Sequence, residues 1–409
     1  MLPTAMKQIM ELMRFITDPN LNSGNLGWAE RLSLRILPPS HKNVKIDKHG
    51  SFTVMPPSPT YTQQPTSETY SEIIDVRSQS EYAEDHMPGA INLPVLDDAE
   101  RAQVGTIYKQ VCPFTARKTG AALVAKNISQ HLIEHFASKE KDYRPLVYCW
   151  RGGQRSNSMA LVLAQIGWRV TVLEGGYKTY RAYVRAQLQQ LPEQFTYQML
   201  CGLTGTGKTS ILHQLGQRGA QVLDLEGLAN HRGSLLGEEW EGKPAPQPQQ
   251  KYFESLLLQR LQGFELSQPV WVESESNKIG RVYLPQSLWQ QMKQASCVEI
   301  QVPLVARVQL LLQQYPHLVN HPDVLKAKLQ LLKSRYGREK LNQWYQLIDA
   351  RQWETFVQDV LQSHYDPTYT QSMERDFTKV ERVLSLPDLS DANINKLVDS
   401  LLPKFVPMS

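Results

Sequence analysis

Pro145-Leu-Val-Tyr-Cys149-Trp-Arg-Gly-Gly-Gln-Arg155-Ser156 is the stretch that decides the fold of the first half of the chain. Its apolar run, 145–148, predicts a buried strand, and its paired glycines predict a tight loop that leads into a helix from Asn157 onward. A strand, a loop and a helix in this order are typical of an α/β domain. The strand therefore brings the thiol of Cys149 to the start of a glycine-rich loop.

The surroundings of Cys149 favour a reactive thiol. The glycines let backbone N–H groups turn inward, the following helix N-terminus adds partial positive charge, and Arg151 and Arg155 add full charges. These groups stabilise the thiolate and can hold an oxyanion in front of it. The alternative is a buried structural cysteine, but the adjacent glycines and arginines favour a nucleophile. The rest of the expected oxyanion loop comprises Trp150, Gly152, Gly153, Gln154 and Ser156.

Strands and helices alternate around this loop, which predicts a mainly parallel sheet covered by helices. The expected strands are 73–76, 145–148 and 169–173, and the expected helices are 79–84, 119–138, 156–166 and 177–190. We assign residues 70–190 to this domain. Residues 1–69 form an N-terminal extension with a predicted helix from Thr4 to Phe15 and a Pro-rich linker from Met55 to Thr69. The sequence leaves open whether translation starts at Met55.

A second motif, Gly202-Leu-Thr-Gly205-Thr-Gly207-Lys208-Thr209, matches the phosphate-binding P-loop pattern. It lies between a predicted strand, 195–200, and a predicted helix, 208–217, as the pattern requires. The glycine backbone cradles a phosphate, Lys208 neutralises the charge of the adjacent phosphate, and the Thr209 hydroxyl can bind Mg²⁺. We assign residues 195–375 to a P-loop domain and 376–409 to a C-terminal helical tail. The other elements expected after the P-loop helix are strands 220–224, 269–272 and 297–302, helix 249–263, and helices from 304 onward.

Acidic residues follow two further strands of the expected P-loop sheet. Glu273 and Glu275 follow one strand and Asp224 follows another, so that a magnesium site at Thr209 with Glu273 or Asp224 is a further expectation. The alternative is that these carboxylates are solvated at strand ends. His231 and Arg232 lie further along the segment that follows the same strand as Asp224, and they can bind phosphate or polarise a leaving group. A His-Arg pair is also common on an ordinary surface.

Two stretches mix basic and aromatic side chains in a way that suits unstacked RNA bases and phosphates. The first contains Tyr177, Lys178, Arg181 and Arg185, close to the rim of the cysteine loop. A solvated helix face is the alternative for both stretches. The second basic stretch contains Lys333, Arg335, Arg338 and Lys340.

The composition limits the class of protein. The 409 residues are 41% hydrophobic and 21% charged, with a net charge of +4, and the length suggests two or three domains. Nucleic-acid binding must therefore come from local patches. The four cysteines lie far apart, which predicts neither a zinc site nor a disulfide framework and fits a reducing cytoplasm. No apolar run approaches the roughly 18 residues of a membrane span, so we expect no membrane contact, and we expect no bound redox cofactor.

The first domain resembles the rhodanese fold. The segments Ile74-Asp-Val-Arg77, His86-Met-Pro-Gly-Ala-Ile-Asn92, the cysteine loop and Leu173-Glu-Gly-Gly176 occur in that family's order. The cysteine loop is one residue longer than in ordinary rhodaneses, because five residues separate Cys149 from Arg155. This larger ring resembles the loop of rhodanese-related phosphatases, which cradles a tetrahedral phosphate.

Together the motifs resemble the tRNA 2-selenouridine synthase family, in which a rhodanese domain is fused to a P-loop domain. The resemblance also rests on Val104-Gly-Thr-Ile-Tyr-Lys109, Asp224-Leu-Glu-Gly-Leu-Ala-Asn-His-Arg-Gly-Ser234 and Tyr365-Asp-Pro-Thr-Tyr369. It departs at Leu236, where the family commonly has Phe, and this difference is expected to lie away from the chemistry.

The resemblance implies that sulfur in wobble-position 2-thiouridine of tRNA is replaced by selenium, with selenophosphate as donor. It implies an S-geranyl-2-thiouridine intermediate made from geranyl diphosphate, and an enzyme that supplies selenophosphate as a partner. Cys149 would attack or carry selenium while Arg151, Arg155 and the loop amides hold the oxyanion. The P-loop, with His231 and Arg232 nearby, would hold the diphosphate.

Two rival functions remain open from the residues alone. One is a rhodanese-like cysteine phosphatase or sulfurtransferase with a nucleotide-binding regulatory domain, in which Asp97 or Asp98 serves as general acid. The other is a non-catalytic scaffold that binds tRNA and carries sulfur on its cysteine. The oligomeric state and the tRNA specificity do not follow from the sequence.

Overall fold

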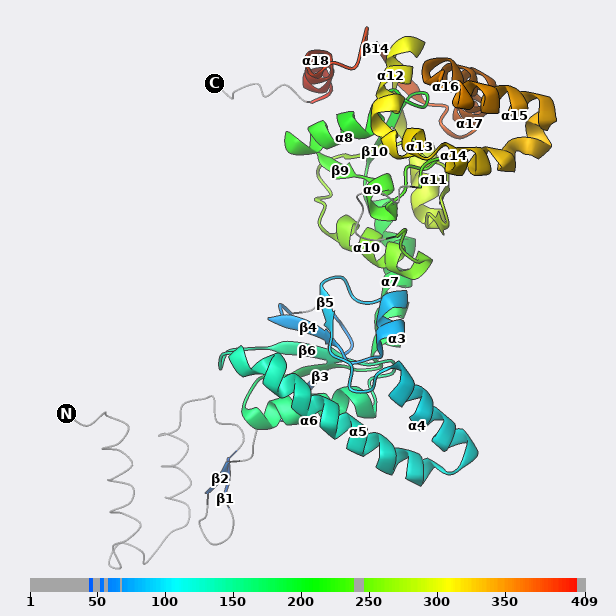
Figure 1. The fold of residues 1–409 in the computed structure, drawn as a ribbon. Helices are drawn as coiled ribbons and strands as arrows, with labels where there is room; N and C mark the ends of the chain where they lie inside the picture. Colours follow the sequence, from blue (N-terminus) through cyan, green and yellow to red (C-terminus); the bar gives the residue numbers. More distant parts are fainter. Residues whose placement is uncertain (1–43, 47–51, 55–57, 67, 239–245, 403–409) are drawn as a thin grey trace, which may run out of the picture.

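The computed structural model describes residues 44–46, 52–54, 58–66, 68–238 and 246–402. The helix predicted from Thr4 to Phe15 lies outside these residues. Figure 1 shows two α/β bodies in chain order, the first in blue to teal and the second in green to red. Strands β1 (Val44–Ile46) and β2 (Phe52–Val54) form a separate antiparallel pair. The α/β fold class predicted from the sequence is confirmed.

The first body is built on a five-stranded parallel sheet with strand order β3-β7-β6-β4-β5. Its strands are β3 (Thr60–Thr62), β4 (Glu72–Asp75), β5 (Ala90–Asn92), β6 (Pro145–Tyr148) and β7 (Thr171–Leu173). β6 is central and buried along its whole length, as its continuous apolar run predicts. The prediction that residues 58–66 belong to a linker is wrong, because β3 pairs with β7 at the edge of this sheet.

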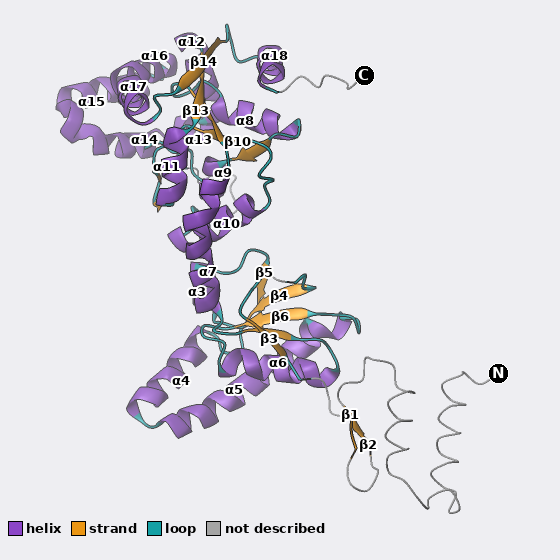
Figure 2. Ribbon diagram, turned by 180° about the vertical axis from the view of Figure 1, so that it is seen from behind, coloured by secondary structure: helices purple, strands orange, loops and turns teal. Residues whose placement is uncertain are grey.

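The helices that cover this sheet are α3 (Gln79–Glu84), α4 (Asp98–Gln110), α5 (Pro113–Glu134), α6 (Gln154–Ile166) and α7 (Tyr177–Gln190). Helix α4 was not predicted, although Asp97 and Glu100 form a capping box at its start. Helix α5 begins earlier than predicted, because Cys112 accepts a hydrogen bond from the Thr115 N–H and proline occupies the first helical position. Figure 2 shows α4 and α5 as an antiparallel pair that extends from the sheet.

The second body has a parallel sheet with strand order β14-β13-β8-β10-β9. Its strands are β8 (Tyr197–Cys201), β9 (Gln221–Leu223), β10 (Val270–Glu273), β13 (Ser296–Gln301) and β14 (Val380–Ser385). Residues 376–409, predicted as a C-terminal helical tail, contain the helix at Asp391–Leu401 but also β14, which pairs with β13 as the edge strand of this sheet. The short strands β11 (Lys278–Ile279) and β12 (Val282–Tyr283) form a hairpin.

The helices of the second body fall into two groups. Those around the sheet are α8 (Lys208–Gln217), α9 (Leu225–Ala229), α10 (Gln250–Gln262), α11 (Gln286–Gln294) and α18 (Asp391–Leu401). Those of the helical region are α12 (Leu304–Gln314), α13 (Pro316–Asn320), α14 (Pro322–Leu329), α15 (Lys333–Asp349), α16 (Trp353–Val360) and α17 (Asp366–Asp376), with a π-helical turn at Leu361–Tyr365. The helical region has its own core around Trp344, which is fully buried. Among the described residues, no helix is long and apolar enough to cross a membrane.

Helix α7 joins the two bodies, because it packs against α10 and α11 of the second body (Figure 1). Tyr180 and Val184 of α7 belong to a hydrophobic cluster that continues into the second body. The Ser255 hydroxyl of α10 donates to the carboxylate of Asp85, which follows α3, at 3.0 Å. The two sites described below therefore lie on bodies that share a packed interface.

Candidate functional site

Cys149 directly follows β6, so the central strand of the first sheet places it at the carboxyl edge. Its side chain is 3% exposed. The Gly153 N–H donates to the Cys149 Sγ atom at 3.3 Å, and the Ser156 Oγ atom lies 3.2 Å from the same sulfur. Helix α6 starts at Gln154, so its N-terminus faces the loop. These contacts are the ones that a thiolate needs, and they match the loop predicted from the sequence.

The Gly175-Gly176 pair at the start of α7 holds the cysteine loop in place. The N–H of Tyr177 donates to the Cys149 carbonyl at 2.8 Å, and that of Lys178 donates to the Trp150 carbonyl at 3.2 Å. A Cβ atom on Gly176 would lie 2.2 Å from the Cys149 carbonyl oxygen, and its φ of 60° is left-handed. Only glycine allows this approach, which explains why the sequence has glycine here.

The two arginines of the loop have different surroundings. Arg155 is 20% exposed and forms an ion pair with Glu81 of α3 at 2.8 Å. Burial opposes ionisation of Glu81, but the hydrogen bond and charge of Arg155 outweigh it and lower the pKa of that carboxyl. Arg101 of α4 lies 3.8 Å from the same carboxylate. Arg151 is exposed. The guanidinium of Arg155 is therefore held beside the loop by Glu81.

The residues predicted to contact tRNA divide into two kinds. Tyr177 is buried, donates its hydroxyl to Asp85 at 2.7 Å and stacks with Trp150. Arg181 pairs with Glu254 of the second body. Tyr177 is thus engaged within the first body, whereas Arg181 reaches across to the second body. Lys178 and Arg185, by contrast, are exposed on α7.

The second basic stretch, on α15, is also partly engaged in internal contacts. Lys340 pairs with Asp359 at 2.7 Å, and the guanidinium of Arg335 lies over the Tyr336 ring. These contacts stabilise the helical region.

The P-loop follows β8, the central strand of the second sheet, and leads into α8 at Lys208. Gly205 and Gly207 have φ values of 82° and 77°, which glycine adopts readily. The Lys208 ammonium donates to the Gly202 carbonyl at 2.7 Å and lies over the Tyr369 ring. The loop thus has the strand, glycines and lysine that the motif predicts.

A cavity of about 600 Å³ opens in front of the P-loop. The predicted residues Gly205, Gly207, Lys208, Thr209, His231 and Arg232 all line it. Arg232 donates to the Gln314 carbonyl at 3.1 Å and lies over the Tyr315 ring, so α12 and the loop after it fix its position. The structure therefore brings these six residues together in one cleft, whereas Gly202, which was also predicted, does not line it and lies against the Ile300 carbonyl.

Three carboxylates surround Thr209. The Thr209 hydroxyl contacts Glu226 at 3.2 Å and Glu273 at 3.1 Å, and the oxygens of Glu226, Glu273 and Glu275 lie within 4.8 Å of one another. Burial, and then the charges of its neighbours, raise the pKa of Glu273 well above its usual range. Burial and the charge of Glu226 raise the pKa of Glu275 to about 8. Such a cluster is unfavourable without a cation.

Asp224, the other acid considered for magnesium, lines the same cleft but is not part of this cluster. Its side chain caps α9 and lies 2.7 Å from His213. Glu226, in the first turn of α9, reaches Thr209 instead. The Asp224-Leu-Glu226 spacing was the available signal, because an N-cap at Asp224 places Glu226 in the first turn of α9, directly after β9.

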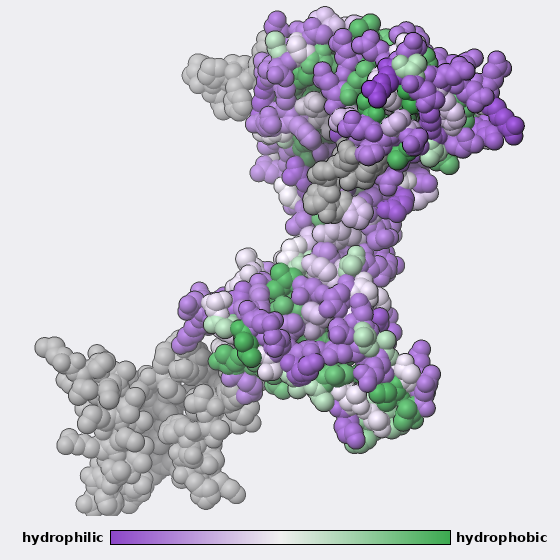
Figure 3. Space-filling view, viewed as in Figure 1, coloured by the Kyte–Doolittle hydropathy of each residue, from purple (hydrophilic) through white to green (hydrophobic). Residues whose placement is uncertain are grey.

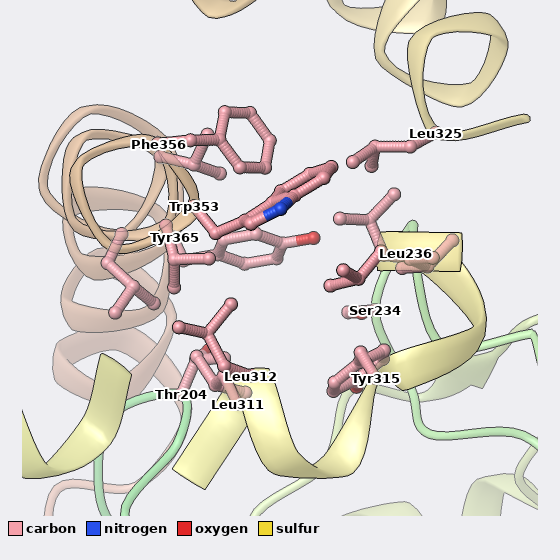
Figure 4. A pocket seen from close by; sticks show the side chains of 15 residues that line it. Thr204, Ser234, Leu236, Leu311, Leu312, Tyr315, Leu325, Trp353, Phe356 and Tyr365 are labelled. Atoms are coloured by element: carbon pink, nitrogen blue, oxygen red, sulfur yellow. The ribbon is translucent and has the colours of Figure 1, made fainter. Parts of the chain in front are cut away.

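A narrow apolar slot adjoins the P-loop cleft and was not foreseen (Figure 4). Thr204, Ser234, Leu311, Tyr315 and Tyr365 line both. Figure 4 shows that side chains from several helices converge on the slot, and its far walls include Leu236, Leu325, Trp353 and Phe356. Leu236 lines this slot but not the P-loop cleft itself, so its place relative to the chemistry depends on what the slot binds.

Comparisons with known proteins agree with this arrangement. A model described as the tRNA 2-selenouridine synthase AAA domain matches residues 195–385, and a rhodanese-like domain model matches residues 58–183. A solved N-terminal domain of a Clostridium difficile 630 protein described as ATP/GTP binding is 34% identical and covers 31% of this chain and 98% of that chain. Its TM-score of 0.28 is too low to support an argument.

Three relatives named tRNA 2-selenouridine synthase are similar in sequence. That of Sulfurovum sp. is 32% identical over 75% of this chain and 90% of the relative, and that of Bdellovibrio bacteriovorus is 32% identical over 74% and 89%. That of Nitrosomonas europaea is 36% identical over 59% of this chain, and this match spans 63% of the relative's length. This similarity agrees with the order of the two domains and with the two loops that the structure contains. The chain belongs to the tRNA 2-selenouridine synthase family.

Proposed function

We propose that this protein is a tRNA-modifying transferase that replaces sulfur by selenium in wobble-position 2-thiouridine, by way of an S-geranyl-2-thiouridine intermediate. The observation that carries the proposal is the apolar slot that begins at the P-loop. A phosphate cleft joined to an apolar slot fits a ligand with a diphosphate head and a hydrocarbon chain better than it fits a nucleotide. The names of the relatives support tRNA as the substrate.

The first step takes place at the P-loop. The P-loop amides, Lys208 and Arg232 bind the diphosphate of geranyl diphosphate, and the slot takes its apolar chain. The C2 sulfur of 2-thiouridine attacks C1 of the geranyl group, so a C–S bond forms while the C–O bond to diphosphate breaks. Diphosphate leaves with the electron pair, and the N3 proton of the base passes to solvent.

The acidic cluster fits a magnesium ion. Glu273 is 1% exposed and its Oε1 atom has no hydrogen-bond partner among the described residues. The charge of Lys208 acts on all three converging carboxylates but does not offset the burial and mutual repulsion that raise their pKa values. Oxygen ligands of this kind suit Mg²⁺, with Thr209 beside them. When bound, the ion would neutralise charge on the diphosphate. The family resemblance alone did not identify Glu226 as one of its ligands.

The second step takes place at Cys149. The thiolate attacks the phosphorus of selenophosphate while Arg151, Arg155 and the loop amides hold its oxygens, so an S–P bond forms and the P–Se bond breaks. The selenide that leaves attacks C2 of the base, and geranylthiolate departs and takes up a proton. Water then cleaves the S–P bond and releases phosphate. A separate enzyme that makes selenophosphate would supply the donor.

The phosphatase alternative has less support. Its candidate acids are used elsewhere, because Asp97 caps α4 by accepting from the Glu100 N–H at 2.7 Å and Asp98 accepts from the Ser80 N–H at 3.1 Å. Neither side chain is directed by these contacts toward the Cys149 loop.

The test is incubation of the protein with 2-thiouridine tRNA, geranyl diphosphate and selenophosphate, followed by mass spectrometry of the nucleosides. We expect S-geranyl-2-thiouridine when selenophosphate is omitted and 2-selenouridine when all components are present. Hydrolysis of an aryl phosphate without any change in the nucleosides would contradict the proposal and favour the phosphatase.

A further inference from the structure

A second large cavity, of about 1350 Å³, lies between α4, α5 and α6, beside the cysteine loop. Trp150, Gln154 and Arg155 of the loop region form its inner end. It shares no lining residue with the P-loop cleft or the apolar slot. The cavity described here, which we call the hairpin cleft, is therefore separate from the site of the first step.

The hairpin cleft is open because its helices present small side chains to it. On α4 the lining positions are one helical face, from Arg101 through Val104 and Gly105 to Tyr108. A Cβ atom on Gly105 would meet no heavy atom within 4 Å, so the glycine borders open space. A Cβ atom on Gly120 of α5 would lie 3.4 Å from Val104, which shows how closely the two helices approach at the base of the cleft.

The lining combines apolar side chains with arginines and with two carboxylates, Glu81 and Glu84, which are paired with Arg155 and Lys251. Tyr108 and Leu161 line the cleft and are 58% and 53% exposed, so both offer a large apolar surface to a ligand in the cleft. Arg101 and Arg117 also line it and are exposed. An apolar surface with arginines at its edge and a nucleophile loop at its inner end matches a ligand with a hydrocarbon group and nearby phosphates. Figure 3 shows the hydrophobic colouring on this body, over the α4 and α5 region.

We propose that the hairpin cleft binds the prenyl chain of the S-prenylated wobble nucleoside while its base is presented to Cys149. This inference rests on the proposed function, since a base that carries a geranyl group must reach the cysteine loop before that group departs. The hairpin cleft is continuous with the cysteine loop, because residues of that loop line the cleft. The arginines at the edge meet the phosphates that flank the nucleoside.

The test measures binding of two synthetic anticodon stem-loops to the full chain, one with S-geranyl-2-thiouridine and one with 2-thiouridine. We expect the geranylated RNA to bind about tenfold or more tightly, which is about 1.4 kcal/mol or more. Gly105→Leu extends into the cleft from a position where a Cβ atom meets no heavy atom within 4 Å, and it places a better helix former on α4, so the variant should fold. It should remove the preference and leave binding of the 2-thiouridine RNA unchanged.

The matched control is Ala102→Leu, which adds the same side chain to an exposed position of α4 outside the cleft and should keep the preference. Leu312→Trp, which fills the slot beside the P-loop, should also keep it. Equal binding of the two RNAs by the wild-type protein, or a preference that survives Gly105→Leu and disappears in Leu312→Trp, would overturn the inference. Because the prenyl group is installed synthetically, this result is independent of whether the protein geranylates RNA, which is assayed separately with geranyl diphosphate.

Discussion

Replacing Gly176 by alanine should disable the cysteine loop while leaving the P-loop site intact. The backbone of Gly176 has a φ of 60° and a ψ of −144°, a region that is costly for any other residue, at about 1–3 kcal/mol. The added Cβ atom would lie 2.2 Å from the Cys149 carbonyl and 2.5 Å from the Gly152 nitrogen, both of which belong to the backbone. The loop must therefore shift by about 1 Å, and displacements of that size at a reacting group lower rates by about 100-fold.

The assay compares conversion of pre-geranylated RNA to 2-selenouridine with geranylation of 2-thiouridine RNA. Gly176→Ala should lose the first activity and keep the second. Gly89→Ala is the control, because it introduces a Cβ at a φ of 81° in the same body with no heavy atom within 4 Å. It should lose stability and keep both activities. If Gly176→Ala retained selenation at the level of Gly89→Ala, the reasoning that Gly176 positions the Cys149 loop would be refuted.

Three further substitutions test other parts of the account. Ser156→Ala removes the hydroxyl 3.2 Å from the Cys149 sulfur and should slow selenation by about tenfold, in line with one hydrogen bond of roughly 1–1.5 kcal/mol, as single-turnover kinetics would measure; an unchanged rate would exclude this contact from the chemistry. Glu273→Gln removes one of three converging carboxylates, so in a chelator it should raise the midpoint of thermal unfolding, and added Mg²⁺ should stabilise it less than the wild type. Equal stabilisation of both proteins by Mg²⁺ would argue against a metal ligand. Arg181→Met breaks the ion pair with Glu254 and should lower the free energy of unfolding by up to about 1 kcal/mol, while tRNA affinity, measured by filter binding, is unchanged. A loss of tRNA affinity larger than that of Lys178→Ala would indicate that Arg181 contacts the RNA.

The sequence predicted those parts of the molecule where one local pattern determines the backbone. The apolar run before Cys149 and the glycines after it specified β6, the loop and α6, and the P-loop pattern specified β8 and α8. In both motifs the strand end, the glycines and the helix start are adjacent in sequence. No long-range contact was needed to place them.

The parts that were missed depend on contacts between distant segments. Strands β3 and β14 are edge strands of ordinary polarity, and only their pairing with β7 and β13 identifies them. Tyr177 and Arg181 have the composition of an RNA-binding face, but Asp85 and Glu254 from other elements engage them. The apolar slot could not be foreseen, because its walls come from helices whose apolar residues are indistinguishable in sequence from core residues.

The division of the two steps between Lys208 and Cys149 is the central claim, and nucleoside mass spectrometry of two variants tests it most directly. With 2-thiouridine tRNA, geranyl diphosphate and selenophosphate present together, Cys149→Ser should accumulate S-geranyl-2-thiouridine without 2-selenouridine. Lys208→Ala should leave 2-thiouridine unmodified and still convert pre-geranylated RNA to 2-selenouridine. Formation of 2-selenouridine by Cys149→Ser at the wild-type level would contradict the account.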